Sequence, residues 1–146
     1  MTGKKKAKSN TRKSRTQARL MIVQALYQMQ LADHDIKELL LQCRERDDYK
    51  KIDKTYFTQA VRAIYKNQNE YSVAIEANLD RPISQIDPIE MGILLLGYYE
   101  LEAKREIDIA VIINEAVNLT KRFGSIDGHK YINAVLDRAA KTVRAA

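Results

Sequence analysis

The segment at 87–101 constrains the fold of this chain more than any other feature of the sequence. Asp87 is a good N-cap, since its carboxylate can accept a hydrogen bond from a free amide of the first turn. Pro88 suits the first helical position, and Glu90 stands where a capping box places an acid. From Met91 to Tyr99 there is then no charged residue. A helix that is apolar on nearly all sides is usually buried, and this one is shorter than the ~20 residues that span a bilayer. We therefore expect the central helix of a soluble core.

The rest of the chain also has the periodicity of helices. Apolar residues recur at helical spacing, and no alternation typical of a strand persists. Further helices are expected at about 15–31, 36–46, 54–78, 109–123 and 128–143, with a short turn at 83–86. The expected N-caps are Ser14 (with Gln17), Asp35, Asp53, Asp108 and Asp127, and the expected C-terminal stop is Gly124. The pattern predicts an all-α fold of six to seven helices.

Positive charge is concentrated at the N-terminal end. Residues 1–19 include eight basic residues and no acidic one, and the rest of the chain has 17 basic against 19 acidic residues. The lysine-rich composition of residues 1–13 predicts a disordered basic arm, followed by one helical domain at 14–146. Such an arm on a nearly neutral body is typical of polyanion binders, most often of nucleic-acid binders. A solubilising tail is the alternative.

Candidates for catalysis are few. Cys43 lies on an apolar stripe, where a cysteine is more often a small buried hydrophobe than a nucleophile. His34 and His129 are isolated, and with one cysteine they do not have the spacing of a zinc site. There is no glycine-rich phosphate loop. The sequence predicts a protein that is not an enzyme and uses no metal or cofactor. A lone cysteine allows no internal disulfide, and we see no signal peptide or membrane span, so a cytoplasmic location is expected.

Aromatic residues lie near basic ones at two places. Tyr27 flanks the apolar stripe of the first predicted helix, which also carries basic residues. Phe123, Lys130 and Tyr131 cluster around the loop at 124–128. RNA-binding proteins combine cations for phosphates with aromatic faces for unstacked bases. Packing in the core or at its rim is the ordinary alternative for each aromatic ring, and spacing alone leaves both interpretations open.

Four segments carry a family pattern in order along the chain. They are VQALY at 23–27, YYEL at 98–101, NEAVNL at 114–119 and FGSIDGHKYINAVLD at 123–137. Together they resemble the NusB family of bacterial transcription antitermination factors. The resemblance runs from about Arg15 to the C-terminus; it is most specific in the last segment and weak over 33–55. It implies an all-helical fold of two small perpendicular bundles.

The resemblance also implies a function without catalysis. Family members pair with the ribosomal protein NusE, and the pair recognises boxA, a single-stranded RNA element of nascent transcripts, notably ribosomal RNA leaders. With other Nus factors and RNA polymerase, the pair suppresses termination in the bacterial cytoplasm, with no membrane involved. Some relatives associate as homodimers when free.

Carried over residue by residue, the resemblance predicts an RNA-binding surface and a protein-binding residue. The RNA-binding residues would be Arg12, Lys13, Arg15, Arg19, Tyr27, Phe123, Asp127, Lys130 and Tyr131. Glu90 matches a glutamate of the family's NusE interface, with helix capping as the competing role. This chain has Thr16 and Gln17 where some relatives have further arginines, and Asn78 where some have an RNA-contacting tyrosine.

Asp127 is unexpected on an RNA-binding surface, because an unpaired carboxylate repels phosphates. It would either cap the last helix or accept a hydrogen bond from a base edge. An Asp127→Asn substitution removes the repulsion and keeps a capping side chain, so it should tighten RNA binding.

Two alternatives from other classes remain at this point. One is the RNA-binding module that is fused to ribosomal RNA cytosine methyltransferases, although 146 residues leave no room for a methyltransferase fold. The other is a protein-interaction bundle whose basic segment is incidental. Salt dependence distinguishes an RNA binder from the second alternative, because release of counterions makes RNA affinity fall as salt rises.

Overall fold

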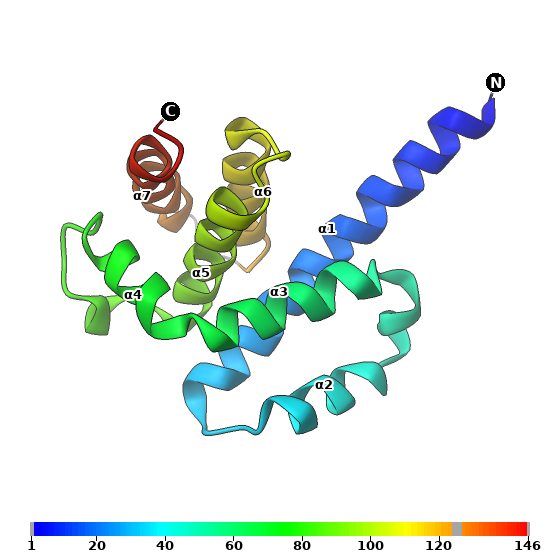
Figure 1. The fold of residues 1–146 in the computed structure, drawn as a ribbon, viewed down its shortest axis with the longest axis horizontal. Helices are drawn as coiled ribbons and strands as arrows, with labels where there is room; N and C mark the ends of the chain where they lie inside the picture. Colours follow the sequence, from blue (N-terminus) through cyan, green and yellow to red (C-terminus); the bar gives the residue numbers. More distant parts are fainter. Residues whose placement is uncertain (1, 124–126, 146) are drawn as a thin grey trace. The chain divides into compact units, whose positions relative to one another are not determined.

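The computed structural model describes residues 2–123 and 127–145, with side chains described from residue 11 onward. Over this part of the chain there are seven α-helices, two 3-10 helices and no strand (Figure 1). They are α1 (Thr2–Leu31), α2 (Ile36–Arg44), η1 (Asp47–Lys51), α3 (Lys54–Lys66), α4 (Gln68–Glu76), η2 (Ile83–Gln85), α5 (Pro88–Ala103), α6 (Ile109–Arg122) and α7 (Gly128–Val143). The prediction of an all-α fold with a short turn near 83–86 is confirmed.

The chain divides into two compact units, one up to residue 62 and one from residue 63 onward. In the first unit, α1 packs against α2, and Asp53 donates its backbone N–H to the carbonyl oxygen of Ser14 at 3.1 Å. The side chain of Asp53 also caps α3, accepting from the N–H of Tyr56 at 3.1 Å. The predicted cap of α2 is present as well, with Asp35 accepting from the N–H of Lys37 at 3.2 Å. The buried apolar residues of α1 are Ala18, Met21, Ile22, Val23, Ala25 and Leu26.

In the second unit, α5 is the central helix. It packs against α4, α6 and α7, and its buried residues follow one another from Met91 to Gly97. Asp87 caps it as predicted, accepting from the N–H groups of Ile89 at 2.7 Å and Glu90 at 3.3 Å. The prediction that the uncharged segment forms a buried helix is therefore confirmed.

Gly97 brings α5 close to α7. A Cβ atom added at this residue would lie 2.8 Å from Cδ1 and 2.9 Å from Cδ2 of Leu136. Leu136 is itself almost completely buried. The absence of a side chain at Gly97 thus provides the space in which Leu136 packs.

The basic segment is part of a helix. The structure starts α1 at Thr2, which corrects the boundary predicted near Arg15. Lysine, alanine and arginine all favour a helix, so a segment with little apolar surface can still extend one that is anchored further along. Ser14 is consequently inside α1 and not its cap; its hydroxyl donates to the carbonyl oxygen of Thr11 at 3.0 Å.

The helix predicted at 54–78 is divided into α3 and α4 at Asn67. This residue lies in a run of polar residues at 66–70, and its side-chain amide donates to the carbonyl oxygen of Ala63 at 2.9 Å. Asparagine side chains compete with helical hydrogen bonding in this way. The single long helix was therefore a wrong prediction.

Three predicted helix ends remain: the N-caps Asp108 and Asp127 and the C-terminal stop Gly124. Asp108 and Asp127 occupy the N-cap positions of α6 and α7, but neither side chain makes a capping hydrogen bond, so this part of the prediction is wrong. Phe123 is the last residue described at the end of α6, and the predicted stop at Gly124 lies outside the described residues.

Arg144 fastens the end of α7 to the end of α5. Its guanidinium donates to the carbonyl oxygens of Leu101 at 2.8 Å, Ile107 at 2.7 Å, Lys104 at 3.0 Å and Glu100 at 3.2 Å. The last carbonyls of a helix have no partner within the helix, and one arginine supplies partners for several of them here.

No helix among the described residues is long and apolar enough to cross a membrane.

Candidate nucleic-acid interface

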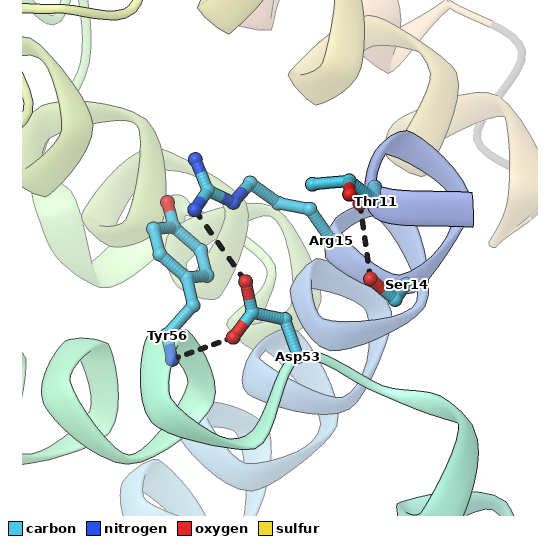
Figure 2. A network of polar contacts seen from close by, with 5 residues as sticks. All are labelled: Thr11, Ser14, Arg15, Asp53 and Tyr56. Carbon is cyan, nitrogen blue, oxygen red and sulfur yellow. Dashed lines mark hydrogen bonds and ion pairs between the residues drawn. The ribbon is translucent and has the colours of Figure 1, made fainter. Parts of the chain in front are cut away.

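Arg15 is held in place by an aromatic ring and a carboxylate. Its guanidinium lies 4.4 Å from the centre of the Tyr56 ring and 3.4 Å from the carboxylate of Asp53 (Figure 2). The Nε atom is buried and has no hydrogen-bond acceptor among the described residues. About a third of the side chain (34%) stays exposed, so a nearby anion can still reach its charge. Tyr56 and Asp53 thus orient an arginine whose charge is only partly neutralised.

The other predicted residues of α1 differ in their exposure. Arg12 and Lys13 are exposed and form no ion pair with another described residue. Tyr27 is partly exposed. Arg19 exposes only 4% of its surface, and its guanidinium lies 5.9 Å from the ring centre of Tyr56. Burial favours a supporting role for Arg19, beneath the surface that Arg12 and Lys13 present.

The predicted residues of the second unit gather at the start of α7. Asp127 is exposed at its N-cap position, Lys130 is exposed in its first turn, and Tyr131 follows with partial exposure. Phe123 is partly exposed at the end of α6. The two groups of predicted residues therefore belong to different units of the chain, and each is described by itself.

The structure adds Arg81 to this second group, although no sequence pattern pointed to it. Its guanidinium lies 4.2 Å from the centre of the Tyr131 ring and 3.0 Å from the carboxylate of Asp80. The hydrogen bond from Arg81 lowers the pKa of Asp80, and burial raises the pKa of the Tyr131 hydroxyl. One face of the Tyr131 ring is therefore covered by a cation.

Glu90 lies close enough to this group to act on it electrostatically. It is partly exposed in the first turn of α5, and its charge contributes to a raised pKa of Arg81, after the larger effect of Asp80. The side chain of Asp87 makes the N-cap hydrogen bonds of α5, to the N–H groups of Ile89 and Glu90.

Two residues that sequence reasoning missed, Tyr56 and Arg81, position the predicted ones. Arg15 and Tyr56 come from α1 and α3, and Arg81 and Tyr131 come from the η2 region and α7. No local pattern links residues this far apart. The only signal in the sequence was chemical, because arginine commonly stacks on aromatic rings.

Other candidates for function have structural roles. Cys43 is buried, and burial raises the pKa of its thiol, which disfavours the reactive thiolate. Asn78 accepts from Nε of Arg138 at 3.1 Å and from Nη2 at 2.7 Å through its backbone carbonyl. Within the described residues, no three His, Cys, Asp or Glu side chains lie together as a metal ion would require.

Comparison with known proteins gives a consistent result. The family model described as "NusB family" matches residues 16–141. The transcription antitermination protein NusB of Pseudomonas syringae pv. tomato is 41% identical over 130 residues, covering 89% of this chain and 79% of that protein. The NusB protein of Nitrosococcus oceani is 40% identical over 131 residues, covering 90% of this chain and 88% of that protein.

Solved structures agree in fold. A structure of T. maritima NusB matches with a TM-score of 0.76 at 28% identity, covering 86% of this chain and 89% of that chain. A structure described as antitermination factors NusB and NusE in complex with dsRNA matches with a TM-score of 0.72, covering 87% of this chain and 96% of that chain. At 21% identity, the second likeness concerns the fold alone.

Proposed function

The chain belongs to the NusB family of transcription antitermination proteins, and from this premise we propose that it binds the single-stranded boxA element of nascent ribosomal transcripts together with the ribosomal protein NusE. The observation that carries the proposal is the family match, which extends over residues 16–141 and so includes most of the candidate RNA-binding residues. The bound pair would help RNA polymerase to pass terminators.

On the first unit, we assign phosphate binding to the exposed residues of α1. Arg12 and Lys13 are free to approach a phosphate, and Arg15 is held in a fixed direction by Tyr56. The guanidinium of Arg19 lies near the same ring, 5.9 Å from its centre. Tyr27 would offer its ring to an unstacked base, because stacking tolerates any base and contributes about 1–3 kcal/mol.

On the second unit, Tyr131 and Phe123 would stack on bases while Lys130 binds a phosphate. The cation Arg81 on Tyr131 adds a further contact for the RNA, since a guanidinium plane can stack or bind a phosphate. Asp127 would then face a base edge, because its side chain caps nothing and is exposed.

Protein partners complete the proposal. We assign Glu90 to the NusE interface and expect a folded Glu90→Lys variant to lose affinity for NusE. Other Nus factors and RNA polymerase would join the complex in the bacterial cytoplasm, and the free protein would form homodimers through the surface that NusE covers. We assign no catalytic activity to the chain.

The experiment that tests the proposal measures binding of a labelled boxA RNA with and without purified NusE, at two salt concentrations. A scrambled RNA and a duplex of equal length are the controls, the duplex because the structural neighbour was solved with double-stranded RNA. We expect selective binding of single-stranded boxA RNA that NusE strengthens and that salt weakens. Equal binding of all three RNAs, unaffected by NusE, would reject the proposal.

A tyrosine pair then locates the surface. Tyr27→Ala should weaken boxA binding by about 1–3 kcal/mol if a base stacks there. Tyr65→Ala is the matched control, because Tyr65 is exposed on α3 and belongs to neither predicted group. Equal effects of the two substitutions would show that Tyr27 has no special role.

A further inference from the structure

A basic hollow lies on the first unit, beside the predicted RNA-binding residues of α1. It has a volume of about 730 Å³ and lies between α1, which contributes Lys13 and Gln17, and the end of η1, which contributes Lys50 and Lys51. The η1 segment lies between the helices that the sequence predicts at 36–46 and 54–78.

The charge of the hollow is almost entirely positive. Lys13, Lys50 and Lys51 are exposed, and none forms an ion pair with another described residue. Asp48 is the one acidic residue of the lining, and Arg46 neutralises it with two hydrogen bonds, of 3.1 Å from Nε and 2.8 Å from Nη2. Three ammonium groups therefore face a common space without a counter-charge from the described part of the chain.

The walls of the hollow are fixed to each other. Directly after η1, the N–H of Asp53 donates to the carbonyl oxygen of Ser14, and the carboxylate of Asp53 pairs with Arg15 (Figure 2). On the other side of η1, Tyr49 packs edge-on against Phe57, with ring centres 6.1 Å apart. A site whose walls are already in place loses little conformational entropy when a ligand binds.

We propose that this hollow binds the phosphodiester backbone of RNA. One wall is formed by α1, and the other by Lys50 and Lys51 of η1. This inference rests on the proposed function and extends it to a segment outside the predicted RNA-binding surface. No aromatic ring lines the hollow, so it offers nothing for a base to stack on. Lysine ammonium groups bind phosphates as point charges, and phosphate contacts position a nucleic acid without reading its sequence.

The first test compares two variants that lose the same charge. Lys50→Gln/Lys51→Gln removes one wall, and Lys37→Gln/Lys66→Gln removes two exposed lysines that lie outside the hollow. For the first variant, we expect on the order of tenfold weaker RNA binding at low salt and a log–log salt slope that is shallower by about 1.4. The control variant should keep the slope of the wild type. Equal slopes for the two variants would overturn the proposal.

The scrambled RNA separates this inference from the proposed function. Because a backbone contact is independent of sequence, Lys50→Gln/Lys51→Gln should weaken boxA and scrambled RNA by the same factor. If the wild-type protein does not prefer boxA over scrambled RNA, the proposed function is rejected. The effect of the variant on binding of scrambled RNA would still show whether the hollow binds the RNA backbone. A loss confined to boxA would overturn the backbone assignment.

A titration with inorganic phosphate, followed by amide NMR, tests the hollow without RNA. We expect shifts at Gln17, Lys50 and Lys51 in the wild-type protein and their loss in Lys50→Gln/Lys51→Gln. If the wild-type protein binds phosphate at these residues but Lys50→Gln/Lys51→Gln binds RNA as tightly as the wild type, the assignment to RNA is overturned. The hollow would then be a site for free phosphate.

Discussion

At the scale of single residues, the cap of α5 is the clearest contribution to stability. Asp87→Ala removes the acceptor of two backbone N–H groups and should lower the free energy of unfolding by about 1 kcal/mol. Asp108→Ala is the matched control, since Asp108 occupies the same position on α6 without a side-chain hydrogen bond. Chemical denaturation measures both. A loss of equal size for the two variants would show that the capping bond is not the cause.

Asp127 is a second aspartate at an N-cap position, but its role is different. Because its side chain makes no capping bond, Asp127→Asn should leave the thermal midpoint nearly unchanged. Asparagine keeps an acceptor oxygen for a base edge and removes a negative charge that repels the RNA backbone, so RNA binding should tighten several-fold. Titration of labelled boxA RNA with NusE present measures the affinity, and weaker binding by the variant would contradict this prediction.

Tyr71 makes stability depend on alkaline pH. Burial, reinforced by the nearby charge of Glu102, raises its pKa to about 12 from the ordinary value of 10. The folded state therefore holds this proton more tightly than the unfolded state does. Its stabilising effect is complete below pH 10 and is lost as the pH rises toward 12. Over this interval, the free energy of unfolding should fall less in Tyr71→Phe than in the wild type, as measured by urea denaturation. Parallel falls would contradict the assignment.

The limits of prediction at the residue scale follow from distance along the chain. Asp87 and Asp35 could be recognised as caps because the groups that they bind lie within one turn. Arg81 could not be placed beside Tyr131, nor Arg15 beside Tyr56, because folding alone brings these pairs together. The sequence therefore identified candidate RNA-contacting cations and aromatic residues. The residues that orient them could be identified only from the structure.

At the scale of helices, sequence patterns predicted which segments are helical better than where the helices end. The helices expected at 36–46, 87–101, 109–123 and 128–143 are confirmed as α2, α5, α6 and α7, and each has buried residues. The errors concern polar segments, where periodicity carries no information: the start of α1 and the division at Asn67. At these places, helix propensity and one side-chain hydrogen bond decide the boundary.

The contact between α5 and α7 gives a prediction of its own. Gly97→Ala adds a methyl group where Leu136 already packs, so the gain of about 1 kcal/mol in helix propensity is offset by crowding of about 1–3 kcal/mol. In a Leu136→Ala background the space is free, and Gly97→Ala should be stabilising relative to that background. A double-mutant cycle by chemical denaturation measures this coupling. Additive effects would show that the two residues do not compete for space.

At the scale of the whole molecule, Arg144 connects the end of α7 to the α5–α6 connection. Arg144→Ala removes the donor to the carbonyl oxygens of Leu101 and Ile107 and should destabilise the protein by about 2–3 kcal/mol. Arg105→Ala is the control, because exposed Arg105 makes one hydrogen bond, to the carbonyl oxygen of Val143 at 3.0 Å. Arg105→Ala should lower the free energy of unfolding by less than about 0.5 kcal/mol. Similar thermal midpoints for the two variants would contradict a special role for Arg144.

The distribution of charge also belongs to this scale. Eight basic residues precede residue 20, and the rest of the chain is slightly acidic. The hollow formed with Lys50 and Lys51 extends this positive potential to a second segment of the first unit. Positive potential concentrated in this way raises the rate at which an anionic polymer meets the protein, and salt reduces that rate.

The contacts of Arg144 also have a consequence for synthesis on the ribosome. The carbonyl groups that it binds belong to residues 100–107, which are translated long before their donor. Folding during translation generally begins with the N-terminal part of a chain, and the residues of the first unit are all available early. The second unit must wait for α7. Until then its most apolar helix, α5, lacks the part of its cover that α7 provides, so slow translation over the last codons would lengthen the time in which the nascent chain is prone to aggregate.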